Sequence, residues 1–172
     1  MLLNDAAGGS SIEQLRYAQS FGIGQTELAR RFDIVALDLR GIGHSDPLAC
    51  ADAPDRPAGI SMFPTSPAQF AALVAANKAL AARCSAGHPE LFAHLDMSSV
   101  ARDVDTVRIG LGESQLSWYG IHYSAALGTV YARMFPGRLR AIVNDSALDV
   151  TTSGVERLSA EITTAEQSFN RF

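Results

Sequence analysis

Apolar residues along this chain form short continuous runs that alternate with longer stretches of helical spacing. The runs at 33–38, 115–120 and 139–144 are typical of buried strands, and the apolar start at 1–3 predicts one more. At 11–21, 26–31, 98–111 and 125–135, apolar residues recur three and four positions apart, which favours helices. This alternation predicts an α/β fold, with a mostly parallel sheet of about three to four strands and helices on both faces.

A helical insertion and a terminal helix extend this pattern. Residues 46–67 hold most of the prolines and have no periodicity, which predicts a loop, and Pro67 then begins an Ala-rich helix to about Arg83. Residues 85–90, with Gly87 and Pro89, predict a break. The tail at 151–172 has one weakly apolar side. We therefore expect a core at 1–150, an insertion at about 46–96 and a separate helical segment at 151–172.

The helix expected at 98–111 has one apolar face and one charged face. Ser98 and Ser99 are candidate caps for its first turn. Helical spacing predicts that Asp103, Asp105 and Arg108 face water.

Composition excludes several classes of function. The chain has 172 residues, 47% of them hydrophobic, enough for one domain with a core. Its net charge of −4 has no long runs, which argues against a nucleic-acid or anionic-membrane surface and favours small or neutral partners. No stretch reaches the roughly 18 apolar residues of a membrane helix, and the start lacks a signal-peptide core, so the sequence as written predicts a cytoplasmic protein.

Two cysteines, Cys50 and Cys84, bracket a segment rich in Ala, Pro and Ser. In a reducing compartment they are small buried hydrophobic residues. In an oxidising one, a disulfide between them would tie the insertion to its base. Both interpretations stay open.

Candidate chemistry lies where the strand at 115–120 turns into the helix at 125–135. Residues 120–124 read Gly-Ile-His-Tyr-Ser, close to the Gly-x-Ser-x-Gly nucleophile elbow of serine hydrolases, in which a strained turn presents the serine above the sheet. The nucleophile position holds His122 and the second glycine position holds Ser124.

Three segments together resemble the α/β-hydrolase superfamily. Residues 32–45, reading Phe-Asp-Ile-Val-Ala-Leu-Asp-Leu-Arg-Gly-Ile-Gly-His-Ser, are similar to its fourth strand and following turn; residues 118–132 are similar to its elbow; and residues 135–139 are similar to the turn after it. The chain is similar to the proline-iminopeptidase branch, which includes secreted tripeptidyl aminopeptidases. The resemblance extends over nearly the whole chain, and it implies a partial α/β-hydrolase fold, a small peptide or ester substrate, and a disulfide between Cys50 and Cys84.

The resemblance also implies a specific strand order and a role for the tail. The run at 1–3 corresponds to the third strand of the family, which lies between the fourth and the fifth. The expected order is therefore 33–38, 1–3, 115–120, 139–144, and exposed edges would invite self-association. Residues 151–172 correspond to the start of a lid helix that is cut short.

Two residues are candidate nucleophiles. His122 is either a strand-end side chain without a chemical role or, in principle, a nucleophile itself. Ser124 is either an N-cap of the helix or the nucleophile of an elbow displaced by two residues, a displacement that keeps the face of the strand.

The remaining catalytic elements also differ from the family pattern. Gly8 and Gly9, with Tyr123, are candidates for an oxyanion loop and pocket, although alanines replace glycines in that loop. The four histidines are His44, His88, His94 and His122, and none follows the elbow, where a triad histidine would lie. We therefore expect a peptidase-like or esterase-like chain without turnover, the alternatives being a binding module and a weak esterase that uses Ser124. No metal or cofactor is predicted.

Overall fold

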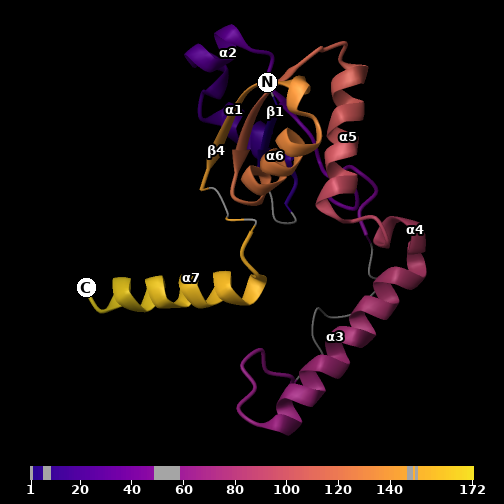
Figure 1. The fold of residues 1–172 in the computed structure, drawn as a ribbon, viewed down its shortest axis with the longest axis vertical. Helices are drawn as coiled ribbons and strands as arrows, with labels where there is room; N and C mark the ends of the chain where they lie inside the picture. Colours follow the sequence, from indigo (N-terminus) through magenta and orange to yellow (C-terminus); the bar gives the residue numbers. More distant parts are fainter. Residues whose placement is uncertain (1, 6–8, 49–58, 147–148, 150) are drawn as a thin grey trace.

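The computed structural model describes residues 2–5, 9–48, 59–146, 149 and 151–172. Its described elements alternate strands with helices, as Figure 1 shows. In chain order they are β1 (Leu2–Asp5), α1 (Ser11–Ser20), η1 (Ile23–Gln25), α2 (Glu27–Arg31), β2 (Val35–Ala36), α3 (Pro67–Gly87), α4 (Pro89–Phe92), α5 (Met97–Gly110), β3 (Leu116–Ile121), α6 (Tyr123–Met134), η2 (Pro136–Arg138), β4 (Leu139–Asp145) and α7 (Gly154–Phe169).

The sheet has the strand order β2-β1-β3-β4, and each of its pairs is parallel. This confirms both the expected order and the parallel α/β architecture. Helices α1 and α2 lie on one face of the sheet, and α5 and α6 lie on the other (Figure 1). The carboxyl ends of the strands therefore meet at one edge, where the turn from β3 into α6 lies.

The core lies between β3 and the two helices α5 and α6. Every second residue of β3 faces these helices, namely Leu116, Trp118 and Gly120. The ring of Trp118 stacks on that of Tyr131 of α6, with the ring centroids 5.7 Å apart. Val104 of α5 is fully buried beside them. This packing fixes the start of α6 against the end of β3.

Three local predictions are wrong in detail. β2 covers Val35–Ala36 rather than 33–38, because β1 pairs with it only at these two residues and a strand is defined by its ladder. The predicted break at 85–90 is confined to His88, since α3 continues to Gly87 and α4 begins at Pro89. Asp96, rather than a serine, caps α5, because its carboxylate accepts the Ser99 amide at 3.0 Å.

The charged face of α5 also differs from the prediction. Asp105 and Arg108 are 6% and 8% exposed, so they do not face water. Asp105 accepts hydrogen bonds from Arg108 Nε at 2.9 Å and from the Tyr131 hydroxyl at 3.0 Å, and Arg138 donates to its second oxygen. These side chains form a cluster that joins α5, α6 and η2.

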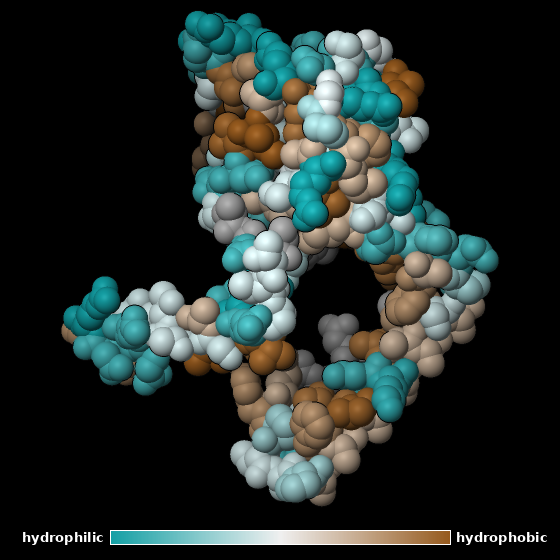
Figure 2. All heavy atoms as spheres, in the orientation of Figure 1, coloured by the Kyte–Doolittle hydropathy of each residue, from teal (hydrophilic) through white to brown (hydrophobic). Residues whose placement is uncertain are grey.

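Helices α3 and α7 project away from the sheet (Figure 1). Figure 2 shows hydrophobic side chains on the surfaces of both projecting helices, and Val155, Leu158, Ile162 and Phe169 of α7 are 57–79% exposed. Ser153 and Glu156 form a capping box at the start of α7. The division at residue 150 and the self-association stay predictions. Within the described ranges, no helix combines the length and apolar character that a membrane crossing requires.

Candidate active site

The turn between β3 and α6 has the backbone geometry of a nucleophile elbow, and His122 occupies its tip. His122 has φ 52° and ψ −119°. A residue other than glycine adopts this backbone conformation only at a cost of about 1–3 kcal/mol. Its amide donates to the Asp145 carbonyl at 3.1 Å, and its carbonyl accepts the Ala125 amide at 3.0 Å. The imidazole is exposed at the carboxyl edge of the sheet.

Two glycines allow β3 and α6 to pack closely on either side of this turn. A Cβ on Gly120 would lie 2.6 Å from the Ser124 carbonyl oxygen and 2.6 Å from Trp118 Nε1. A Cβ on Gly128 would also lie 2.6 Å from Trp118 Nε1. Real side chains do not approach this closely, so β3 and α6 can touch only because both positions are glycine.

Ser124 lies inside the first turn of α6 rather than at the tip of the elbow. It is 2% exposed, and its hydroxyl has no hydrogen-bond partner among the described residues. The N-cap position of α6 belongs to His122, which makes no side-chain capping bond, so the interpretation of Ser124 as a cap is wrong. A displaced elbow centred on Ser124 also lacks structural support, because the strained residue is His122 and the serine oxygen is enclosed.

The buried hydroxyl of Ser124 predicts an unusual response to mutation. An unsatisfied buried hydroxyl costs about 1–3 kcal/mol, so Ser124→Ala is expected to raise the free energy of unfolding by about 1 kcal/mol. Urea denaturation followed by circular dichroism measures this change. Ser99→Ala, which removes a hydroxyl that donates to Asp96 at 2.7 Å, is the matched control and is expected to lower stability. A loss of stability in Ser124→Ala would show that its hydroxyl has a partner.

Other predicted site residues lie at or near the same edge. β1 runs beside β3 as far as the pair Asp5 and Ile121, so the end of β1 lies next to the elbow. Gly9 is exposed, whereas Gly8 lies outside the described residues. Tyr123 follows His122 and is 45% exposed. It borders an apolar hollow of about 150 Å³ together with Ser124, Leu39, Leu95, Met97, Val100 and Leu127.

A buried carboxylate that was not among the predicted site residues, that of Asp38, holds the segment before α1 to the turn after β2. Asp38 is 1% exposed and accepts hydrogen bonds from the Ser10 hydroxyl at 2.8 Å, the Ile12 amide at 3.1 Å and the His44 amide at 2.9 Å. Burial raises the pKa of Asp38, but the His44 and Ile12 amides and the Ser10 hydroxyl outweigh burial and hold that pKa below its usual value. The Asp-x-Arg-Gly-x-Gly-x-Ser turn was the sequence signal for this site.

The remaining chemistry-bearing residues are distributed over other parts of the fold. His44 Nε2 lies 3.0 Å from Glu13 Oε1, on the opposite face of the sheet from α6. Cys84 is buried and disulfide-bonded, whereas Cys50 lies outside the described residues, so their pairing stays a prediction. In the described part of the chain, no group of three or more His, Cys, Asp and Glu side chains is placed to hold a metal ion.

Comparison with known proteins shows the family to which the chain belongs. Residues 18–169 match the family described as alpha/beta hydrolase fold. A tripeptidyl aminopeptidase of Streptomyces coelicolor is 31% identical over 144 residues, which make up 83% of this chain and 27% of that protein. The carboxylesterase B of Mycobacterium tuberculosis is 34% identical over 176 residues, covering 100% of this chain and 34% of the esterase.

The serine protease Hip1 of Mycobacterium tuberculosis is 29% identical over 160 residues, covering 89% of this chain and 31% of the protease. The chain thus spans about a third of the length of the curated relatives that it matches. The match over residues 18–169, the parallel sheet and the strained elbow lead to one assignment: the chain belongs to the α/β-hydrolase superfamily.

Proposed function

We propose that this chain binds peptide or ester groups at its elbow without hydrolysing them through an acyl-serine. The observation that supports the proposal best is the position of His122, which has the strained conformation of the nucleophile but carries an imidazole. An acyl-serine needs a hydroxyl oxygen at this position. The hydroxyl of Ser124, two residues further along the chain, is buried in the first turn of α6.

Two features favour binding at this edge. The imidazole of His122 is exposed next to the first turn of α6, where backbone amides favour a carbonyl or carboxylate oxygen. The hollow of about 150 Å³ beside Tyr123 has the size of a small apolar side chain or acyl group, since a cavity of that volume holds benzene. A ligand of this kind would place its carbonyl near His122 and its apolar group against Leu95 and Met97.

The first test is hydrolysis. We expect the 172-residue chain to release p-nitrophenolate from p-nitrophenyl butyrate at the rate of buffer with free imidazole, and to remain unlabelled by a fluorophosphonate probe. Ser124→Ala and His122→Ala are expected to give the same result as the natural sequence. Probe attached to Ser124, or an acyl group found on His122 by mass spectrometry, would contradict the proposal.

The second test is binding. Saturation-transfer NMR with N-acetyl-leucine amide is expected to show contact between its methyl groups and the protein. Leu95→Lys should remove this signal because Leu95 borders the hollow and is 39% exposed. Leu28→Lys, at a residue of similar exposure outside the hollow, is the matched control. An equal signal in all three proteins would place the contact elsewhere.

A further inference from the structure

The hollow beside Tyr123 has walls from separate parts of the chain. Leu39 belongs to the segment after β2, Leu95 to the loop between α4 and α5, and Val100 to α5. Tyr123 and the next residues of α6 close the remaining side. Because these parts are distant in the sequence, the shape of the hollow depends on the contacts that hold them together.

The side chain of Arg40 joins three of these walls. Its Nε and Nη2 donate to the two carboxylate oxygens of Asp103 on α5, both at 2.6 Å. Its Nη1 donates to the carbonyl oxygen of His94, the residue before Leu95, at 3.0 Å. Every nitrogen of the guanidinium therefore has an acceptor. The acceptors belong to α5 and to the loop that carries Leu95, and Arg40 itself belongs to the segment after β2.

The loop that carries Leu95 is held close to this segment. Gly41, next to Arg40, has φ 77°, and a Cβ at this position would lie 3.4 Å from Leu95 Cδ2. On the other side of Leu95, Asp96 caps the first turn of α5. The bond from Arg40 to the His94 carbonyl holds the same loop from its amino side. A shift of the loop would therefore move the Leu95 side chain relative to the hollow.

The contacts of Arg40 fix geometry more than they stabilise the fold. Its side chain is 26% exposed and that of Asp103 is 38% exposed, and ion pairs so accessible to water contribute little to stability. Two parallel bonds to one carboxylate nevertheless orient the plane of a guanidinium. This orientation directs the third nitrogen at the His94 carbonyl. A lysine ammonium is a single point charge and does not reproduce this arrangement.

We propose that Arg40 is a positioning residue for the hollow, and that it sets a preference for ligands with a leucine-sized apolar side chain by holding Leu95 at the border. This inference rests on the proposed binding of peptide or ester groups at the elbow. Arg40 acts through the His94 carbonyl and does not itself contact the ligand. A side chain that reaches Leu95 gains from the arrangement, whereas the shorter side chain of alanine does not.

Titrations of the 172-residue chain with N-acetyl-leucine amide and N-acetyl-alanine amide, followed by protein NMR, test this preference. The natural chain is expected to bind the leucine compound about tenfold more tightly, because leucine has more apolar surface to bury. Arg40→Lys should reduce this preference to about threefold by weakening binding of the leucine compound alone. A general loss of packing would instead weaken binding of both compounds and leave their ratio unchanged.

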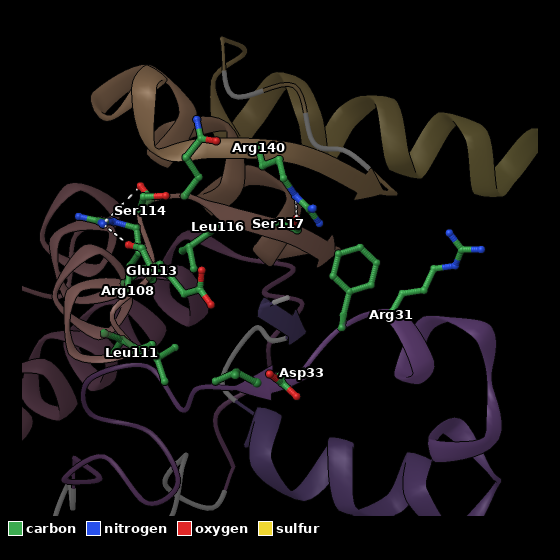
Figure 3. Close-up of a pocket in the computed structure, with 14 residues that line it drawn as sticks. Arg31, Asp33, Arg108, Leu111, Glu113, Ser114, Leu116, Ser117 and Arg140 are labelled. Carbon is green, nitrogen blue, oxygen red and sulfur yellow. Dashed lines mark hydrogen bonds between the residues drawn. The ribbon is translucent and has the colours of Figure 1, made fainter.

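Arg140→Lys is the matched control. Arg140 borders a larger hollow, of about 410 Å³, where its Nε donates to the Ser117 hydroxyl oxygen at 3.0 Å (Figure 3). This hollow lies at the first residues of β3 and β4, away from Tyr123. The control is therefore expected to keep the preference of the natural chain.

Asp103→Ala tests the same arrangement from the other side. If Asp103 orients Arg40, this variant should lower the preference to about the same value, and the double variant should lower it no further. Circular dichroism verifies that each variant is folded. Additive effects of the two changes, or an unchanged preference in Arg40→Lys, would overturn the role of Arg40 and leave binding at the elbow intact. Absence of binding of both compounds to the natural chain would overturn the proposed function, and this inference with it.

Discussion

Replacing Asp105 by alanine is expected to lower the free energy of unfolding by about 4 kcal/mol, the usual cost of removing one partner from a buried charged cluster. Asp105 is 6% exposed, and its carboxylate accepts hydrogen bonds from Arg108, Tyr131 and Arg138. Alanine would leave the guanidinium of Arg108 and the hydroxyl of Tyr131 without their shared acceptor. A buried polar group without a hydrogen-bond partner destabilises the folded state more than the loss of a contact at the surface does.

The same helix offers a matched control. Asp103 forms a bidentate ion pair with Arg40, with both distances 2.6 Å, but its side chain is 38% exposed. Because water competes for exposed ion pairs, Asp103→Ala is expected to cost at most about 1 kcal/mol. Urea denaturation of both variants, followed by Trp118 fluorescence, measures the difference. Equal losses in the two variants would mean that burial of Asp105 contributes nothing.

The dependence of stability on pH gives Asp105 a second signature. Burial raises the pKa of Asp105, but hydrogen bonds from Arg108 and Tyr131 and the charges of Arg108 and Arg138 outweigh burial and hold this pKa below its usual value. A depressed carboxyl pKa stabilises the folded state above the unfolded value of about 4 and stops doing so as pH falls through the folded value. The natural chain should therefore lose stability in acid more steeply than Asp105→Asn.

The pKa of Tyr131 predicts how the stability of the fold changes at alkaline pH. Burial, the hydrogen bond to Asp105 and the negative charge of Asp105 raise the pKa of Tyr131 to about 12. The protonated phenol is then favoured in the folded state, so its contribution to stability is complete below the unfolded value of about 10 and disappears as pH rises through about 12.

The sequence predicts the order of elements well because each element has a strong local signal. Pro67 begins α3, and Ser66 before it caps the helix by accepting the Gln69 amide. The apolar runs of β3 and β4 are continuous, and both strands form within one residue of their predicted bounds. Strand order follows from the resemblance to a known fold rather than from any local pattern, and the structure confirms it.

Features that depend on distant partners are not visible in local patterns. Helical spacing placed Asp105 toward water, but Arg138, which lies 33 positions away, and Tyr131 pair with it in the folded chain. β2 is short because its ladder with β1 contains two pairs. In both cases a tertiary contact decides the outcome, and no window of neighbouring residues contains that information.

The candidate site was partly predictable for the same reason. Glycine at 120 and the change from strand to helix indicated an elbow, and the strained φ of His122 agrees with it. The environment of Ser124 was not predictable, because residues distant in the sequence, such as Val100 of α5 and Leu39 after β2, border the same hollow as Ser124. A serine in a first helical turn usually indicates a cap, but here the preceding backbone is strained and His122 holds the cap position.

Gly120→Ala is expected to lower the free energy of unfolding by about 3 kcal/mol, at the upper end of the cost of overpacking a core. The added methyl group would lie 2.6 Å from the backbone oxygen of Ser124 and 2.6 Å from Trp118 Nε1. A flexible side chain can move away from a new methyl group, but a helical carbonyl cannot do so without displacing α6. Thermal denaturation followed by circular dichroism measures the loss.

Gly110→Ala is the matched control, because no atom lies within 4 Å of its added methyl group and the residue is helical. Alanine favours a helix more than glycine does, so this variant is expected to gain up to about 1 kcal/mol. If Gly120→Ala were as stable as the natural chain, β3 and α6 would not be in close contact. His122 would then not be held in its strained conformation, and the elbow would lose its structural basis. The stability of this one variant therefore tests the geometry on which the proposed binding at His122 depends.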